Sequence, residues 1–252
     1  MLYEDTKRKL LEMHLTTMAQ AFEEQLRDPT YTSLQFEDRF GMLVDAEFAQ
    51  RKTNRLKSLT KKADFPSKEA CLEGIDYLPE RKLDKAQILR LASCQYIQDT
   101  HNVIIQGATG SGKTYLATVL GLEAVKRFYR VKYIRLPDLL CEMKLAMASN
   151  SFRSMVDNYQ KFQLLIIDEW LLFSLSVEDS RNLLEIVESR YHKSSTIFCS
   201  QFDVKGWYSN IGDPLAADAI CDRIVHDSYT ITLAGSESMR KLKGLNNYNN
   251  LK

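Results

Sequence analysis

The chain has 252 residues, of which 44% are hydrophobic and 27% are charged, an ordinary composition for a globular protein of one or two domains. The 34 lysines and arginines balance 33 acidic residues, so bulk charge does not indicate a nucleic-acid or membrane partner, and any basic surface must be local. No stretch of about 18 consecutive apolar residues occurs, which excludes a transmembrane helix.

The chain shows no sign of secretion either. Its N-terminal sequence lacks the charged region, apolar region and cleavage site of a signal peptide. The five cysteines form no Cys-x-x-Cys pair, which argues against a disulfide framework or a structural zinc site. We therefore expect a cytoplasmic protein with reduced thiols.

The first part of the chain has the pattern of two amphipathic helices. Apolar residues recur at helical spacing over residues 7–27 and stop at Asp28-Pro29. A second helix is predicted to start at Thr32, which fits a capping box together with Gln35. The apolar face of this second helix consists of Phe36, Phe40, Leu43, Val44 and Phe48. Its three phenylalanines are expected to pack in a helical core rather than to stack on bases, because they recur at helical spacing.

The second helix runs into a basic stretch over residues 51–62, which contains no acidic residue. Clustered lysines and arginines neutralise phosphates and release counterions, which gives salt-sensitive DNA affinity on any sequence. The alternative is the solvated face of an ordinary helix. The predicted DNA-binding residues are Arg51, Lys52, Arg55, Lys57, Lys61 and Lys62.

Beyond a linker of mixed composition, strand and helix patterns alternate from residue 83 onwards. Such alternation predicts an α/β fold with a parallel sheet. The strands are predicted at 102–106, 131–135, 163–168, 196–200 and 230–233, and the helices at 84–98, around 116–122, up to 160 and at 178–192.

A glycine-rich loop carries the clearest chemical signal. Residues 107–114 fit the pattern G-x-x-x-x-G-K-[ST] between a predicted strand and a predicted helix. Glycines let backbone N–H groups approach a phosphate chain, and the helix N-terminus adds positive charge. Lys113 supplies a cation for the β- and γ-phosphates, and Thr114 supplies a hydroxyl for Mg²⁺. A glycine-rich turn without a ligand is the alternative. The predicted ATP-binding residues are Gly107, Ala108, Thr109, Gly110, Ser111, Gly112, Lys113, Thr114 and Tyr115.

A second apolar strand ends in two acidic residues, Asp168 and Glu169. A carboxylate after an apolar run lies at the carboxyl end of a buried strand, where α/β sheets bind ligands. Asp168 is therefore predicted to hold Mg²⁺ together with Thr114, and Glu169 to activate a water molecule as general base. A small-molecule kinase transfers the phosphoryl group to an acceptor other than water and needs no base to activate water. The acidic pair therefore favours ATP hydrolysis over kinase activity.

Two further residues are candidates for catalysis. Gln201 follows the predicted strand 196–200 and could orient the attacking water beside the γ-phosphate. Arg223 could stabilise the charge of the transition state, in cis or from a neighbouring subunit. The alternatives are an ordinary strand end and a surface arginine that is paired with Asp222 or Asp227.

On these motifs the chain resembles the IstB-like AAA+ ATPases, which help insertion-sequence transposases, and it is similar to DnaC-type helicase loaders. The similarity extends over nearly the whole chain, including the opening helices, the phosphate loop and residues 165–169. Gln201 falls at the family's sensor position, and residues 222–226 resemble the box that holds its inter-subunit arginine finger. Residues 235–240 resemble a segment whose arginine, here Arg240, is expected to sense nucleotide.

The resemblance implies a P-loop NTPase core of the AAA+ type, preceded by a small all-helical N-terminal domain. The chain ends at residue 252, too soon after the family's last segment for a full C-terminal lid domain. Residues 170–173 depart from the family's usual Leu-Gly-Tyr. The implied domains are 1–65 for DNA binding, 66–82 as a linker, 83–245 as the AAA+ ATPase domain and 246–252 as a frayed tail.

The resemblance also implies a function, that of an ATP-dependent assembly factor. With ATP and Mg²⁺ bound, the protein would form a homo-oligomer on duplex DNA, with ATP at the subunit interfaces. It would present the DNA to a transposase, and hydrolysis would act as the switch. The alternatives are a replicative helicase loader acting on single-stranded DNA and a small-molecule kinase, which the acidic pair disfavours. No membrane partner is expected.

Overall fold

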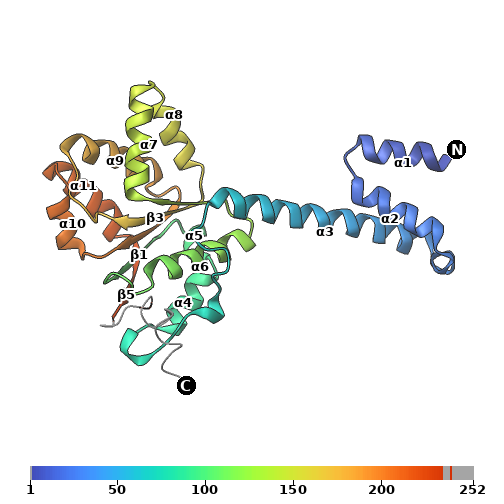
Figure 1. Cartoon of the computed structure of the whole chain (residues 1–252), viewed down its shortest axis with the longest axis horizontal. Helices are drawn as coiled ribbons and strands as arrows, with labels where there is room; N and C mark the ends of the chain where they lie inside the picture. The colour runs from blue at the N-terminus through green and yellow to red at the C-terminus, as the bar shows by residue number, and fades with distance from the viewer. Residues whose placement is uncertain (1, 235–238, 240–252) are drawn as a thin grey trace, which may run out of the picture. The chain divides into compact units, whose positions relative to one another are not determined.

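The computed structural model describes residues 2–234 and residue 239 (Figure 1). The chain divides into two compact units, with the division after Ser58, inside helix α3. None of the helices in the described part of the chain is long and apolar enough to cross a membrane.

The first unit consists of helices α1 (Leu2–Glu12), α2 (Thr16–Arg27) and most of α3 (Phe36–Ala63), with a 3-10 turn η1 (Pro29–Ser33). The single helix predicted over 7–27 is wrong, because the chain turns at His14, which has a φ of 59°. The turn is held by Glu47 of α3, whose carboxylate accepts hydrogen bonds from the backbone N–H groups of Thr17 and Met18, 3.0 Å each. A carboxylate is favourable there because it meets the positive end of α2.

The predicted start of the second helix at Thr32 is also wrong. Asp28 accepts a hydrogen bond from the backbone N–H of Thr30, and the Thr32 hydroxyl donates to the carbonyl of Pro29. These local bonds form the 3-10 turn instead of a capping box, since short polar side chains compete for the backbone. Helix α3 begins at Phe36.

The apolar face expected for α3 is buried only at Leu43, which is 7% exposed. Phe36, Phe40, Val44 and Phe48 are 73%, 47%, 43% and 66% exposed. The prediction that the three phenylalanines pack in a helical core is therefore wrong, and Val44 is exposed as well. Their spacing of four residues shows that they share one face of the helix, but nothing in the described chain covers that face.

The second unit begins with the end of α3 and two 3-10 turns, η2 (Leu72–Gly74) and η3 (Pro79–Arg81). The predicted helix 84–98 is two helices, because Cys94 adopts a φ of 66° between them. The sequence did not predict the two helices that follow Gln201, α10 (Val204–Asn210) and α11 (Pro214–Val225).

The elements of the second unit after η3 are α4 (Lys85–Ala92), α5 (Gln95–Gln98), β1 (Asn102–Gly107), α6 (Lys113–Lys126), β2 (Val131–Arg135), α7 (Leu136–Ala148), α8 (Phe152–Gln160), β3 (Leu164–Trp170), α9 (Val177–Arg190), β4 (Ser195–Ser200), α10 (Val204–Asn210), α11 (Pro214–Val225) and β5 (Ser228–Leu233).

The strands form a five-stranded sheet in the order β2-β3-β4-β1-β5, and all of its pairs are parallel. The predicted parallel α/β sheet is confirmed. Because the strands are parallel, their carboxyl ends share one edge, and the loop after β1 meets the acidic end of β3 there. Helices α7, α9, α10 and α11 lie on one side of the sheet and α4 and α6 on the other (Figure 1).

The core of this unit follows the alternation of the strands. On one face, Ile104, Leu165, Ile167 and Phe198 join the apolar cluster formed with α7 to α11. On the other face, α6 packs so closely that a Cβ at Gly121 would lie 2.6 Å from the ring of Phe65 and 2.8 Å from Ile166. Burial on both faces explains the continuous apolar runs in β1 and β3.

Candidate functional site

The loop between β1 and α6 has the backbone expected of a phosphate cradle. Gly110 and Gly112 lie in the left-handed region, with φ angles of 79° and 97°, which glycine adopts without steric cost. At Gly107, a Cβ would lie 2.8 Å from the carbonyl oxygen of Leu233. Glycine is therefore required at that position for the loop to pass β5. Gly112 precedes the first residue of α6, so the loop ends at a helix N-terminus, which favours anions.

The lysine of the loop is buried and folded back onto it. Lys113 is 8% exposed, and its Nζ donates to the carbonyls of Gly107 at 2.6 Å and Ala108 at 2.9 Å. The ammonium group is therefore already located at the loop that would bind a phosphate chain. A bound phosphate would replace neutral carbonyl acceptors by charged ones, which form stronger hydrogen bonds.

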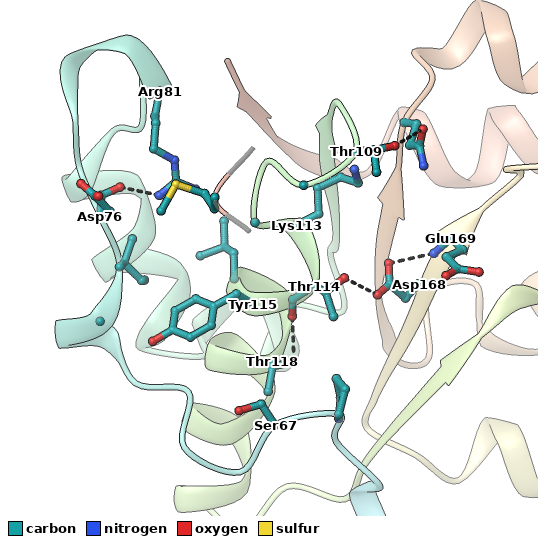
Figure 2. A pocket seen from close by; sticks show the side chains of 18 of the residues that line it. Ser67, Asp76, Arg81, Thr109, Lys113, Thr114, Tyr115, Thr118, Asp168 and Glu169 are labelled. Atoms are coloured by element: carbon teal, nitrogen blue, oxygen red, sulfur yellow. Dashed lines mark hydrogen bonds between the residues drawn. The ribbon is translucent and has the colours of Figure 1, made fainter. Parts of the chain in front are cut away.

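The structure brings Thr114 and Asp168 together as a candidate metal site (Figure 2). Thr114 Oγ1 donates to Asp168 Oδ2 at 2.6 Å, and the Tyr133 hydroxyl donates to the same oxygen at 2.8 Å. Burial, together with the charge of Asp168, raises the pKa of Tyr133, which therefore remains a donor. No group of three or more potential His, Cys, Asp or Glu ligands occurs in the described residues. One hydroxyl and one carboxylate suit Mg²⁺, which keeps water and phosphate oxygens as its other ligands.

The backbone at Glu169 is strained. Its φ of 56° lies in the left-handed region, which is costly for a residue with a side chain, by about 1–3 kcal/mol. The Glu169 N–H donates to Asp168 Oδ1 at 2.8 Å, and the pairing of β3 with β4 shifts between Ile167 and Trp170. Arg135 Nη2 lies 2.7 Å from Glu169 Oε2, and this carboxylate raises the pKa of Arg135.

Trp170 anchors the strained segment. Its side chain is fully buried, with its ring 4.6 Å from that of Phe198 and 5.9 Å from that of Trp207. This aromatic packing fixes the chain directly after Glu169.

Gln201 also lies at the loop. Its Oε1 accepts a hydrogen bond from Thr109 Oγ1 at 2.9 Å, so the end of β4 meets the phosphate loop directly. The side chain is exposed and lines the same cavity as Asp168 and Glu169.

The loop and strand ends border a cavity of about 750 Å³ (Figure 2). Its second wall comes from residues 66–83, which the sequence indicated only as a linker and the start of the core. Tyr115 fastens that wall, because its hydroxyl bonds to the backbone N–H and carbonyl of Cys71 at 3.3 and 3.2 Å. The linker residues of the cavity are Pro66, Ser67, Gly74, Ile75, Asp76 and Arg81, followed by Leu83.

Arg223 does not line this cavity. It lies on α11, where its guanidinium pairs with Glu188 of α9 and lies 5.8 Å from the ring centre of Tyr191. A single chain therefore does not bring Arg223 to the phosphate loop. Arg240 and the tail 246–252 lie outside the described residues. Met239 is described, and its backbone N–H donates to the carbonyl of Gly110 at 2.9 Å.

The six predicted DNA-binding residues are all exposed on α3. They are spread around the helix rather than in one stripe, because successive residues are offset by about 100°. Arg51 also has a structural role, since it pairs with Glu47 at 2.7 Å and donates to the carbonyl of His14 at 3.0 Å.

Three residues near the site escaped the sequence interpretation: Arg81, Tyr133 and Arg135. None lies in a recognisable motif. Only Arg135 had a sequence feature that could have indicated a place at the site. It ends a predicted strand, and the carboxyl ends of parallel strands meet at one edge of the sheet.

A parallel sheet with a phosphate loop after β1 and an acidic pair at the end of β3 defines a P-loop NTPase core of the AAA+ type. DnaA from Aquifex aeolicus, solved with AMPPCP, has a TM-score of 0.58 at 20% identity, over 70% of this chain and 54% of that one. DnaI has a TM-score of 0.56 at 21% identity, over 66% and 92% of the two chains. At these identities the likeness shows the fold alone, and it confirms the predicted fold class.

The family follows from sequence similarity. The model of the IstB-like ATP binding protein family matches residues 8–246, and the chain belongs to this family, as predicted. An insertion sequence ATP-binding protein from Sinorhizobium fredii, y4pL, is 36% identical over 241 residues, which cover 96% of this chain and 98% of the relative. An ATP-binding protein of insertion sequence IS1162 from Pseudomonas fluorescens is 38% identical over 201 residues, 80% and 87% of the two chains.

Proposed function

We propose that this protein is an ATPase that assembles on duplex DNA and delivers it to the transposase of an insertion sequence. The relatives are described as insertion sequence ATP-binding proteins. One observation carries the ATPase part: the Thr114 hydroxyl of the phosphate loop donates to Asp168, and Glu169 follows in the chain. Such a pair of oxygen donors beside a base is the arrangement that metal-assisted hydrolysis of a phosphoanhydride requires.

Each residue of the loop edge has a role in this proposal. The loop amides and Lys113 bind the phosphate chain, and Thr114 and Asp168 would hold Mg²⁺, which supplies charge neutralisation at the β- and γ-phosphates. Glu169 accepts the proton of the attacking water, and Gln201 orients that water beside Thr109.

The oligomeric part rests on Arg223. Because Arg223 does not line the cavity of its own chain, we propose that it serves the ATP of a neighbouring copy, for which its guanidinium would exchange Glu188 for that ATP. An arginine supplied from another chain stabilises the charge that develops on the γ-phosphoryl group. ATP then strengthens the subunit contact, and hydrolysis weakens it, since a ligand shifts an assembly only by its differential affinity.

The DNA-binding part rests on the exposed basic residues of α3. The stretch 51–62 contains no acidic residue, and clustered lysines and arginines offer phosphate contacts whose affinity falls with salt. The helices before the linker are thus assigned as the DNA-binding domain, and residues from 83 onwards as the ATPase domain.

The test is to size the protein on duplex DNA with ATP and then with ADP. We expect a large complex with ATP and a smaller one with ADP. Lys113→Ala should lose ATP binding, Glu169→Gln should bind ATP and remain assembled, and Arg223→Ala should lose assembly and hydrolysis together. Glu178→Gln and Arg153→Ala, which change exposed residues away from the cavity, are the matched controls.

A monomer under both conditions would reject the assembly. Preference for single-stranded probes, with capture of a helicase rather than a transposase, would favour the loader alternative. If the protein releases ADP and phosphate from ATP with no phosphoryl acceptor present, the kinase alternative is excluded.

A further inference from the structure

The wall of the cavity opposite the acidic pair holds a buried arginine, Arg81, at the end of η3 (Figure 2). Its side chain lines the cavity and the residue is 9% exposed. Nη1 donates to the carbonyl of Asp76 at 2.6 Å, and Nη2 donates to the carbonyl of Ser111 in the phosphate loop at 2.8 Å. The guanidinium therefore connects the linker to the loop.

Within the described part of the chain, Arg81 forms no ion pair with a carboxylate. Both acceptors are neutral carbonyls, and no carboxylate of the described residues lies within the 4.0 Å of an ion pair. Burial lowers the pKa of Arg81, and the nearby Asp76 offsets this only in part. Burial without an ion pair to a described carboxylate disfavours this cation, so an anion bound in the cavity would stabilise it. A guanidinium has five N–H donors. Two of them bond to the carbonyls of Asp76 and Ser111, so other N–H groups can donate to such an anion.

The position of the guanidinium indicates which anion. A Cβ at Gly112 would lie 2.9 Å from Arg81 Nη2, so Arg81 lies directly against the backbone where the loop enters α6. Lys113 is the next residue and is also buried. Two cations therefore lie at one loop, and a phosphate chain carries the negative charge that attracts both.

We propose that Arg81 is a second cationic ligand of the nucleotide's phosphate chain, supplied by the linker rather than by the loop. The inference rests on the proposed binding of ATP and deepens it. Because Arg81 also holds Asp76 and Ser111, nucleotide binding and the order of the linker are coupled through this one side chain.

The test measures the affinity of the full chain for ATP, ADP and AMP at two salt concentrations. Arg81→Gln should weaken binding of ATP and ADP by about tenfold or more, in line with the loss of a charge-assisted hydrogen bond. The loss for AMP should be smaller, and the salt dependence of ATP binding should fall. Lys82→Gln is the matched control, because it removes the same charge from an exposed neighbour on the same turn and should change each affinity less than twofold.

A structural clamp would give a different result. If Arg81→Gln weakens ATP, ADP and AMP by one common factor with an unchanged salt dependence, the proposal is overturned. If Arg81→Gln does not fold, Arg81→Lys provides the test: it should keep the preference for ATP over AMP and the salt dependence, and loss of both would overturn the proposal. Failure of the unmodified protein to bind ATP would instead reject the proposed function, and Lys113→Ala identifies that case.

Discussion

Arg135 Nη2 lies 2.7 Å from Glu169 Oε2, so an arginine at the end of β2 holds the carboxylate that we propose as general base. The two side chains are 48% and 32% exposed, and an ion pair of this exposure contributes little to stability. Its effect falls on the carboxylate, because the guanidinium already occupies Oε2, one of the two oxygens that could accept a proton from the attacking water.

Arg135→Ala is therefore predicted to raise the basal rate of ATP hydrolysis several-fold, with little change in ATP affinity. Steady-state kcat and KM for ATP hydrolysis measure this. Arg130→Ala, at an exposed arginine just before the same strand, is the control and should leave kcat unchanged. A fall in kcat would mean that Arg135 holds Glu169 in its working position instead.

Tyr133→Phe removes one of the two hydroxyl donors to Asp168 Oδ2. Groups that orient a metal-binding carboxylate affect metal affinity by about 10- to 100-fold. We expect the Mg²⁺ concentration for half-maximal hydrolysis to rise by about tenfold at saturating ATP. The substitution keeps the buried ring, so thermal unfolding should change little. An unchanged Mg²⁺ requirement would remove Tyr133 from the metal site.

The basic stretch predicts a salt effect. Lys57, Lys61 and Lys62 changed together to Gln should weaken binding equally on all duplex sequences. The slope of log affinity against log salt should flatten by about 0.9 for each DNA phosphate that the variant no longer neutralises. A control with Lys161, Lys193 and Lys205, exposed lysines elsewhere, changes the net charge equally. Equal effects of the two triple variants would show that α3 has no special role.

Arg51 is left out of that variant because its bonds to Glu47 and the carbonyl of His14 hold the turn between α1 and α2. Its removal would combine weaker DNA binding with a less stable fold.

Two glycines in helices should respond to alanine in opposite directions. At Gly121 a Cβ would lie 2.6 Å from Phe65, and overpacking of this kind costs about 1–3 kcal/mol. At Gly41 no atom lies within 4 Å of a Cβ, and alanine in a helix interior gains about 0.5–1 kcal/mol over glycine. Urea unfolding of Gly121→Ala and Gly41→Ala measures both. A stable Gly121→Ala protein would show that Phe65 is not held against α6.

Much of the α/β core was predictable because its signals are contiguous in the chain. The apolar runs of β1 and β3, the spacing of glycines in residues 107–114 and the acidic pair in β3 each specify a local backbone or a local charge. The sheet is parallel because the strands alternate with helices, which leaves crossover connections as the natural link. The order of these segments along the chain was therefore enough to predict that the loop 107–114 meets Asp168.

The features that the sequence did not predict depend on which segments pack against one another. The periodicity of apolar residues does not identify a segment's packing partner. Spacing places Phe36, Phe40 and Phe48 on one face of α3, but it does not reveal whether another segment packs there. The linker becomes a wall of the cavity through Tyr115 and Arg81, whose partners lie 44 and 30 residues away. Arg135 and Glu169 meet because the register of β2 on β3 sets Arg135 beside Asp168. Contacts between residues so far apart in sequence depend on the order of the strands in the sheet and on the path of the connections between them. Both are determined by the packing of the whole core.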